Sequence, residues 1–179
     1  MFRGQPEWTR RARLILRSGI IKSLHVLNAA CALHFLSTFG MFQFMYGPSM
    51  LPTLATHGEI AFEDRFTVRH DPSKIQRGDL LTVRSPLDPR RILCKRVIGL
   101  PGDVVCVDPT GHRAPSTEHV LIPRGHLWLA GDNAANSKDS RMFGPVPIGL
   151  VEGRLVARVW PLSRFTVFRN PTQVLGYDP

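Results

Sequence analysis

A long stretch without charge is the strongest constraint on this chain. Between Ser23 and Gly58 the sequence contains no Asp, Glu, Lys or Arg, and the part from Ser23 to Met45 is mostly apolar. As a helix, residues 23–45 would extend about 34 Å, which is enough to cross a hydrocarbon core of about 30 Å. We therefore expect one transmembrane anchor over residues 23–45.

Four polar side chains interrupt the expected anchor: His25, Asn28, His34 and Gln43. In lipid, each polar group must find a partner or a path to the interface. Two alternatives therefore stay open, an interfacial or buried helix of a soluble protein and a targeting segment that is removed. His25 and His34 are nine residues apart and do not share one helical face, so a metal pair is not indicated.

Positive charge precedes the expected anchor. The chain has 23 Lys and Arg against 14 Asp and Glu, a net charge of +9, and residues 1–22 form a basic tail. By the positive-inside tendency this tail stays on the side from which insertion begins, which places the carboxyl-terminal bulk across the membrane. No stacking platform or binding motif accompanies the charge, so we expect no nucleic-acid partner. The arginines near the amino terminus are Arg3, Arg10, Arg11, Arg13 and Arg17.

After Tyr46 the sequence changes to short apolar runs separated by Pro, Gly and Asp, which is typical of an all-β domain. We expect this domain over residues 46–168, followed by a loosely held tail over residues 169–179. A Pro-Gly turn over residues 100–103 is expected to join the strand of Lys95 to the next strand as a hairpin. The expected strands are 60–63, 79–84, 91–98, 103–107, 119–122, 126–129, 154–160 and 165–168.

Ser49 stands out just after the apolar stretch. Pro48 and Pro52 flank it, so the backbone is restricted where a hydroxyl would need a fixed direction. An ordinary turn would explain the same prolines. The hydroxyl is a candidate nucleophile only if a base lies beside it.

Lys95 lies in an apolar run, residues 92–98, that predicts a strand. Alternation places Lys95 and Arg96 on opposite faces, so one of them must point inward or into a cleft. Burial would lower the pKa of a lysine, and a neutral amine can take a proton from a serine hydroxyl. The alternative is a lysine at a strand edge that reaches solvent.

A third segment, residues 131–141, is rich in Asn, Asp and Ser, as structural loops are. Within it, Ser137 could hydrogen-bond the Lys95 amine, and Asp139 and Arg141 could form an ion pair. The acids lack an accompanying ligand cluster, so we expect neither a metal nor a cofactor. The three cysteines form no C-x-x-C pair, and free thiols are favoured over a Cys94–Cys106 bridge.

Taken together, the three segments resemble the signal peptidase I family, and within it the mitochondrial inner membrane protease, subunit 1 type. The similarity runs through nearly all of residues 46–168, including residues 77–79, 95–103, 131–133 and 136–141. The resemblance implies an antiparallel β catalytic domain with one amino-terminal transmembrane helix. It also implies site residues: Ser49 as nucleophile, Lys95 as general base, Ser137 as the residue that orients Lys95, and Asp139 and Arg141 as supporting residues.

The resemblance further implies a serine endopeptidase that removes hydrophobic sorting segments from precursors. Its catalytic domain would face the intermembrane space, and its partner would be a second, related protease subunit. One departure concerns the oxyanion, because some bacterial members have a hydroxyl residue where this chain has Gly47. The second oxyanion donor is therefore open.

Other functions remain as alternatives. A bacterial-type leader peptidase is the nearest rival, although the short region between Asp103 and Gly131 argues against the larger bacterial forms. A self-cleaving repressor domain would need a helix-turn-helix where this chain has an apolar stretch. An inactive membrane-tethered interaction subunit is disfavoured because Ser49, Lys95 and Ser137 are all present.

Overall fold

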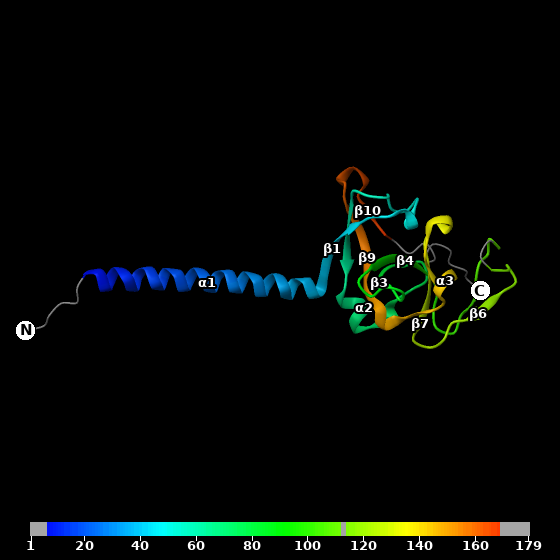
Figure 1. Cartoon of the computed structure of the whole chain (residues 1–179), viewed down its shortest axis with the longest axis horizontal. Helices are drawn as coiled ribbons and strands as arrows, with labels where there is room; N and C mark the ends of the chain where they lie inside the picture. The colour runs from blue at the N-terminus through cyan, green and yellow to red at the C-terminus, as the bar shows by residue number, and fades with distance from the viewer. Residues whose placement is uncertain (1–6, 112–113, 169–179) are drawn as a thin grey trace, which may run out of the picture. The chain divides into compact units, whose positions relative to one another are not determined.

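The computed structural model describes residues 7–111 and 114–168, and it divides the chain after Thr38 into two compact units. Helix α1 spans Glu7–Phe39, and the first unit contains this helix as far as Thr38. Figure 1 shows α1 as one continuous helix. Within α1, residues Gly19–Phe39 are long and apolar enough to cross a membrane, with a mean hydropathy of 1.3.

The helix differs from the expected anchor over 23–45 at both ends. It begins at Glu7, so the described part of the basic tail is helical, and residue 22 is not an element boundary. It ends at Phe39, where Gly40 starts a strand. A Cβ at Gly40 would come within 2.9 Å of the backbone oxygen of Glu63, so a glycine lets the new strand approach its neighbour closely. Residues 40–45 are therefore sheet, and the expectation of a helix there was wrong.

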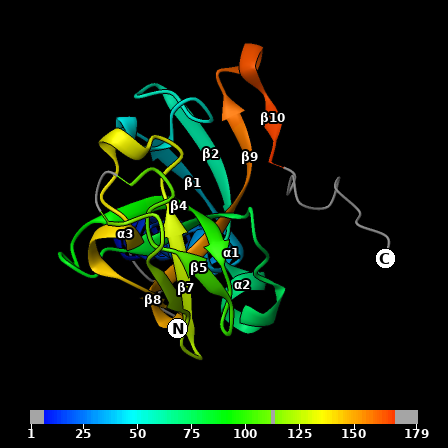
Figure 2. The same cartoon turned by 90° about the vertical axis from the view of Figure 1, so that its right-hand side faces the viewer.

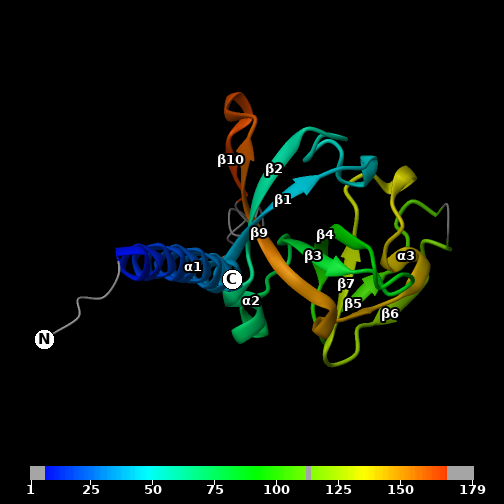
Figure 3. The same cartoon turned by 60° about the vertical axis from the view of Figure 1, so that its left-hand side comes forward.

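The second unit is built on antiparallel strands, as expected. The main sheet has the order β1-β2-β9-β3-β4-β7-β8, with β10 paired to β9, and β5 and β6 form a separate pair. Figures 2 and 3 show β1, β2 and β9 side by side. The strands are β1 Gly40–Met45, β2 Glu59–Asp64, β3 Leu80–Arg84, β4 Ile92–Gly99, β5 Val104–Cys106, β6 His119–Leu121, β7 His126–Ala130, β8 Val146–Pro147, β9 Val151–Trp160 and β10 Thr166–Val167.

The helices of this unit are short. They are α2 Phe66–His70, α3 Ser140–Phe143, and the 3₁₀ turns η1 Pro48–Met50, η2 Pro72–Lys74, η3 Ala134–Asn136, η4 Ile148–Leu150 and η5 Leu162–Arg164. Each of the eight expected strands has a counterpart, which confirms the all-β prediction. The sequence analysis missed β1 and β8. The expected tail, residues 169–179, lies outside the described residues, as do residues 1–6 of the basic tail.

The turn after β4 is confirmed, but the hairpin is not. The amide of Asp103 donates to the oxygen of Leu100 at 3.0 Å, and Gly102 has a φ of 91°, which favours glycine. Strand β5 then pairs with β6 and not with β4. The reason is that β3 and β7 already occupy both edges of β4, so no unpaired edge remains for β5.

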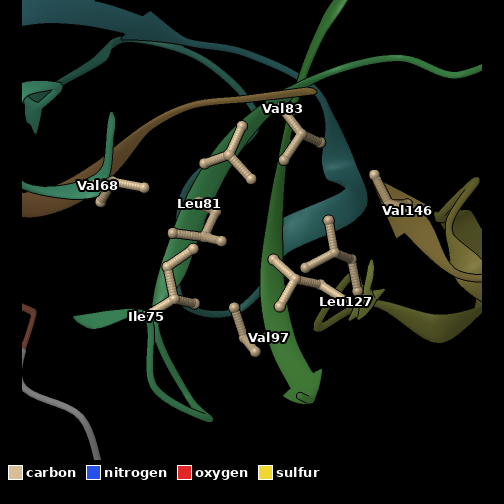
Figure 4. Close-up of a cluster of buried hydrophobic side chains, with 9 residues drawn as sticks. Val68, Ile75, Leu81, Val83, Val97, Leu127 and Val146 are labelled. Atoms are coloured by element: carbon tan, nitrogen blue, oxygen red, sulfur yellow. The ribbon is translucent and has the colours of Figure 1, made fainter. Parts of the chain in front are cut away.

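Two clusters of buried apolar side chains form the core. The larger one takes Leu81 and Val83 from β3 and Val97 from β4, and these side chains gather between the ribbons in Figure 4. Its other buried members are Val68, Ile75, Leu127, Leu129, Val146 and Val151. This cluster fixes β3 and β4 against each other, with Leu81 opposite Lys95 in the register.

The smaller cluster fixes the loop after β1. Met50 and Leu54, on either side of a Pro-containing turn, are buried against Ala61, Leu80 and Leu155. Burying a side chain of this size stabilises the fold by about 1.5–3 kcal/mol. The loop that carries Ser49 is thus anchored by the residue that follows Ser49 and by one five positions along the chain.

Candidate active site

The structure brings Ser49 and Lys95 together from positions 46 residues apart. Ser49 lies on η1, and Lys95 lies in the middle of β4. The Lys95 Nζ atom is 2.9 Å from the Ser49 Oγ atom, which is hydrogen-bond distance. A candidate nucleophile and a candidate base are therefore in direct contact.

Lys95 is 2% exposed. Burial lowers the pKa of its amine from the ordinary 10.5, since removing a cation from water disfavours the charged form. The opposite-face prediction is confirmed by the register, because Lys95 lies opposite Leu81 of the larger core cluster and Arg96 lies opposite Leu80 of the smaller one. A lower pKa increases the fraction of the amine that is neutral, and an amine must be neutral to accept a proton as a general base.

The end of β7 packs directly against the loop that carries Ser49. The amide of Asn133 donates to the backbone oxygen of Ser49 at 3.0 Å, and the Asn133 side chain donates to the oxygen of Pro48 at 3.1 Å. Position 131 has no room for a side chain, since a Cβ there would come within 2.6 Å of the Ser49 backbone oxygen and would also collide with the Ser137 hydroxyl. The sequence analysis singled out residues 131–133 as a motif but assigned Asn133 no role.

Asp139 and Arg141 form the expected ion pair. Two guanidinium nitrogens of Arg141 donate to the Asp139 carboxylate at 2.9 and 2.6 Å, and the amide of Gly131 donates to it at 2.9 Å. Burial alone would raise the pKa of Asp139, but bonds from Arg141, Gly131 and Ser137 outweigh it and lower the pKa. Asp139 also caps α3, so it ties the helix, the end of β7 and the loop between them.

Ser137 is buried, and its hydroxyl lies beside the space above Gly131. The Ser137 hydroxyl is one of the groups that lower the pKa of Asp139. The Lys95 amine hydrogen-bonds Ser49. The proposed orienting of Lys95 by Ser137 stays a prediction.

The sequence analysis missed a second polar cluster, made of Arg96, Asp132 and Thr53. Arg96 forms a two-pronged ion pair with Asp132, at 2.8 and 2.7 Å, and the Thr53 hydroxyl donates to the same carboxylate at 2.5 Å. Burial would raise the pKa of Asp132, but the bonds from Arg96 and Thr53 lower it. This Arg96–Asp132–Thr53 cluster joins β4, the end of β7 and the loop that carries Ser49. Its sequence signal was the Arg that directly follows Lys95.

A cleft of about 540 Å³ contains both Ser49 and Lys95. Strand β1 supplies Gln43, Phe44 and Met45 to its wall, and β4 supplies residues 92–95. Among the described residues, no group of three or more His, Cys, Asp or Glu side chains could hold a metal ion. Cys31, Cys94 and Cys106 are free thiols, and burial raises the pKa of Cys94 to about 12, which makes it a poor nucleophile.

The sequence of this domain matches a known protein family. The family model described as signal peptidase, peptidase S26, matches residues 20–114 and 109–160. This chain belongs to the S26 signal peptidase family. The match covers all five site residues predicted from the sequence.

Three relatives sharpen the comparison. The mitochondrial ATP-independent inner membrane protease subunit 1b of Arabidopsis thaliana is 37% identical over 88% of this chain and 90% of its own length. The mitochondrial inner membrane protease subunit 1 of Schizosaccharomyces pombe is 47% identical over 66% of this chain and 73% of its own length. The mitochondrial inner membrane protease subunit 2 of Saccharomyces cerevisiae is 41% identical over 66% of this chain and 67% of its own length. Within the S26 family, this chain is thus similar to the mitochondrial inner membrane proteases.

Proposed function

We propose that this chain is a serine endopeptidase of the mitochondrial inner membrane that removes hydrophobic sorting segments from precursor proteins, with Ser49 as nucleophile and Lys95 as general base. The observation that carries the proposal is the 2.9 Å contact between Ser49 Oγ and the buried Lys95 Nζ. The names of the family and of the relatives support the same activity.

The chemistry follows from that contact. The Ser49 oxygen attacks the scissile carbonyl carbon while its proton passes to the neutral Lys95 amine. The tetrahedral adduct collapses as Lys95 returns the proton to the leaving amine, which yields an acyl-enzyme. Lys95 then takes a proton from water, the resulting hydroxide attacks the ester carbon, and the proton returns to Ser49 as the acid departs.

The oxyanion needs donors near Ser49. Gly47 offers no hydroxyl and Pro48 has no amide hydrogen, so the backbone N–H of Ser49 is the donor that the nucleophile loop itself supplies. Gly47 has a φ of 102°, a conformation that a residue with a Cβ rarely adopts. A glycine at position 47 therefore favours this loop geometry, and a residue with a hydroxyl side chain at this position would have to adopt a strained backbone conformation.

The domain limits are part of this proposal. We assign residues 1–18 to a basic tail, Gly19–Phe39 to the membrane span, residues 40–168 to the peptidase domain and residues 169–179 to a carboxyl-terminal tail. The catalytic unit faces the intermembrane space in this proposal. The partner is a second, related protease subunit, since relatives are named both subunit 1 and subunit 2.

The test is cleavage of a sorting-segment precursor by detergent-solubilised protein co-expressed with its candidate partner. Wild type is compared with Ser49→Ala and Lys95→Met, each in the presence of the same partner carrying an inactivating substitution at its own serine. We expect wild type to cut and both folded variants to be inactive. If the variants cut as well as wild type does, the activity belongs to another site.

A further inference from the structure

Glu59 is a buried acid that the reaction derived above does not use. It is the first residue of β2 and is 2% exposed. Its Oε1 atom accepts from Arg158 Nη1 of β9 at 2.9 Å, and Arg164 Nη1 approaches the same oxygen at 3.4 Å. Its Oε2 atom accepts from the backbone amide of Ala55 at 3.0 Å. Burying a carboxylate is costly unless such bonds satisfy it, so the folded chain must keep these donors in place.

Arg158 connects this carboxylate to backbone groups. Its Nη1 atom carries two hydrogens and donates both to Glu59 and to the backbone oxygen of Thr53, the latter at 3.2 Å. Its Nε atom donates to the backbone oxygen of Arg164 at 2.7 Å, and its Nη2 atom donates to the Thr166 hydroxyl at 3.1 Å. Four acceptors therefore fix the orientation of the planar guanidinium group.

The nucleophile loop, residues 47–56, is closed by its own hydrogen bonds. At its ends the amide of Gly47 donates to the oxygen of Thr56 at 2.7 Å. In its middle the amide of Leu54 donates to the oxygen of Met50, the residue after the nucleophile, at 2.9 Å. Both bonds link the second half of the loop to the first half. A shift of the second half is therefore passed on to the nucleophile.

The second half of this loop contains no Asp, Glu, Lys or Arg, so charged groups from other elements hold it. Glu59 bonds the backbone amide of Ala55, and Arg158 bonds the backbone oxygen of Thr53. The Thr53 hydroxyl bonds Asp132 instead. Glu59 and Arg158 thus fix the backbone of the loop, whereas the cluster of Asp132 fixes one of its side chains.

Neither Glu59 nor Arg158 is among the described residues that line the cleft. A substitution of either residue therefore changes the support of the loop and not the side chains of the cleft wall. The contact of 2.9 Å between the Ser49 hydroxyl and the Lys95 amine depends on that support. Reaction rates fall steeply when a nucleophile is displaced by a fraction of its contact distance.

We propose that Glu59 and Arg158 are positioning residues for catalysis, because they hold the backbone of residues 53–55 and thereby keep the Ser49 hydroxyl within reach of the Lys95 amine. The proposal rests on the proposed peptidase function and adds two residues that support it. Neither residue touches the reacting atoms, and both act through the nucleophile loop.

The test separates the chemical step from substrate binding. The full chain, in detergent with a partner subunit that is inactivated at its own serine, is mixed in excess with labelled precursor, and single-turnover rates are measured as the enzyme concentration is raised. In Glu59→Gln one oxygen becomes an amide nitrogen, which faces either the Ala55 amide or Arg158, so a donor meets a donor and one bond is lost. We expect the rate at saturating enzyme to fall about tenfold and the half-saturating concentration to change less than about twofold.

Glu152→Gln is the matched control. Glu152 is also a glutamate that accepts from two arginines, but these are Arg69 of α2 and Arg84 of β3. The control removes the same charge at the same size, and its rate at saturating enzyme should equal that of wild type. Denaturant unfolding confirms that both variants are folded at the assay temperature.

Arg158→Met is the second variant, which gives an answer even if Glu59→Gln does not fold. It removes the bond to the Thr53 oxygen, while the Ala55 amide keeps its acceptor. It should also lower the rate at saturating enzyme and leave the half-saturating concentration unchanged. In the double variant the fall should be smaller than the product of the two single falls, because both residues hold the same half of the loop.

Two failures are distinguishable. The positioning role is refuted, while the peptidase function stands, if wild type cuts but the folded Glu59→Gln and Arg158→Met variants keep its rate at saturating enzyme. The same holds if only the half-saturating concentration changes, or if Glu152→Gln slows the reaction equally. If wild type cuts no precursor while the partner is bound, the peptidase function and the positioning role fall together.

Discussion

At the scale of single residues, the site depends on an amine that is kept out of water. The Lys95 side chain is nearly inaccessible to water, and its amine contacts the Ser49 hydroxyl. A lysine in this position destabilises the fold whenever it is protonated. The proposed role of Lys95 in catalysis requires the burial that lowers the stability of the fold.

The first prediction concerns pH. Since burial lowers the pKa of Lys95 below the ordinary 10.5, kcat/KM should rise with pH, with a slope approaching one, and level off below pH 10.5. The unfolded chain binds the Lys95 proton more tightly, so the free energy of unfolding should also rise with pH between the folded pKa and 10.5. Initial rates and denaturant unfolding across this range check both. An absent acid limb in kcat/KM would contradict the assignment of Lys95 as the base.

The second prediction separates catalysis from stability. Lys95→Met removes the buried amine but keeps a chain of similar length, so activity should be lost while the free energy of unfolding at pH 7 rises by about 1 kcal/mol. Ser49→Ala should lose activity with little change in stability, because Ser49 is only half-buried. Urea unfolding, with the precursor assay in parallel, measures this. A strongly destabilised Lys95→Met would mean that the amine has a structural role.

At the scale of elements, the end of β7 and the loop that follows it hold the nucleophile loop in place. Gly131, Asn133 and Asp132 each contact that loop from the β7 side. The Asp139–Arg141 pair then fixes the same segment from behind.

The third prediction tests this packing. Gly131→Ala should lower kcat/KM about 100-fold, because a Cβ would press on the Ser49 oxygen and displace the nucleophile. Gly149→Ala is the matched control, since a Cβ at Gly149 meets nothing within 4 Å and its φ is not positive. Circular dichroism confirms folding and the precursor assay reports activity. Equal activity of the two variants would show that the packing does not set the position of Ser49.

The fourth prediction concerns the buried ion pair. Asp139→Ala leaves the Arg141 guanidinium unpaired at 9% side-chain exposure and should cost about 3–5 kcal/mol of stability. The double variant Asp139→Ala/Arg141→Met should recover part of that loss, because no buried charge remains. Denaturant unfolding of both variants measures the loss of stability and its recovery. Because its pKa is lowered, Asp139 contributes stability that is lost as pH falls through its folded pKa.

The sequence predicted elements better than their pairing. Apolar runs bounded by Pro and Gly located eight strands, and alternation placed Lys95 and Arg96 on opposite faces. Strand β1 was missed because its residues continue the apolar character of α1, and only the partner β2 makes them a strand. The β4–β5 hairpin was wrong because pairing depends on which edges are free, which no local pattern reveals.

The same limit applies to the site. Ser49 and Lys95 could be proposed because each lies in an unusual local context and because the family resemblance joins them. Glu59 could not be proposed, since a glutamate in an alternating strand is normally exposed, and its burial depends on Arg158 from another strand and on the Ala55 amide of the nucleophile loop. Contacts between distant segments are what the sequence alone did not provide.

At the scale of the whole molecule, the chain combines one apolar helix segment with a catalytic unit whose cleft is rimmed by positive charge. Arg90, Arg91 and Lys138 are exposed and line the cleft. Exposed charges of one sign attract oppositely charged partners over about 8–10 Å at ordinary salt.

The fifth prediction concerns topology. The protein should resist carbonate extraction from mitochondrial membranes, because Gly19–Phe39 is long and apolar enough to span them. Protease added to mitochondria whose outer membrane has been opened should degrade the catalytic unit and leave a fragment that contains the helix. Recovery in the soluble fraction would refute the anchor, and full protection would place the catalytic unit on the other side.

The Arg96–Asp132–Thr53 cluster has a consequence for thermal motion. Lys95 and Arg96 are neighbours on β4, so any displacement of this strand carries the base directly and, through Arg96, pulls Asp132 and Thr53 of the nucleophile loop the same way. Ser49 and Lys95 thereby move together when the sheet fluctuates. The distance between the Ser49 oxygen and the Lys95 nitrogen should thus vary less than the position of either atom. The contact between them should persist while the sheet fluctuates.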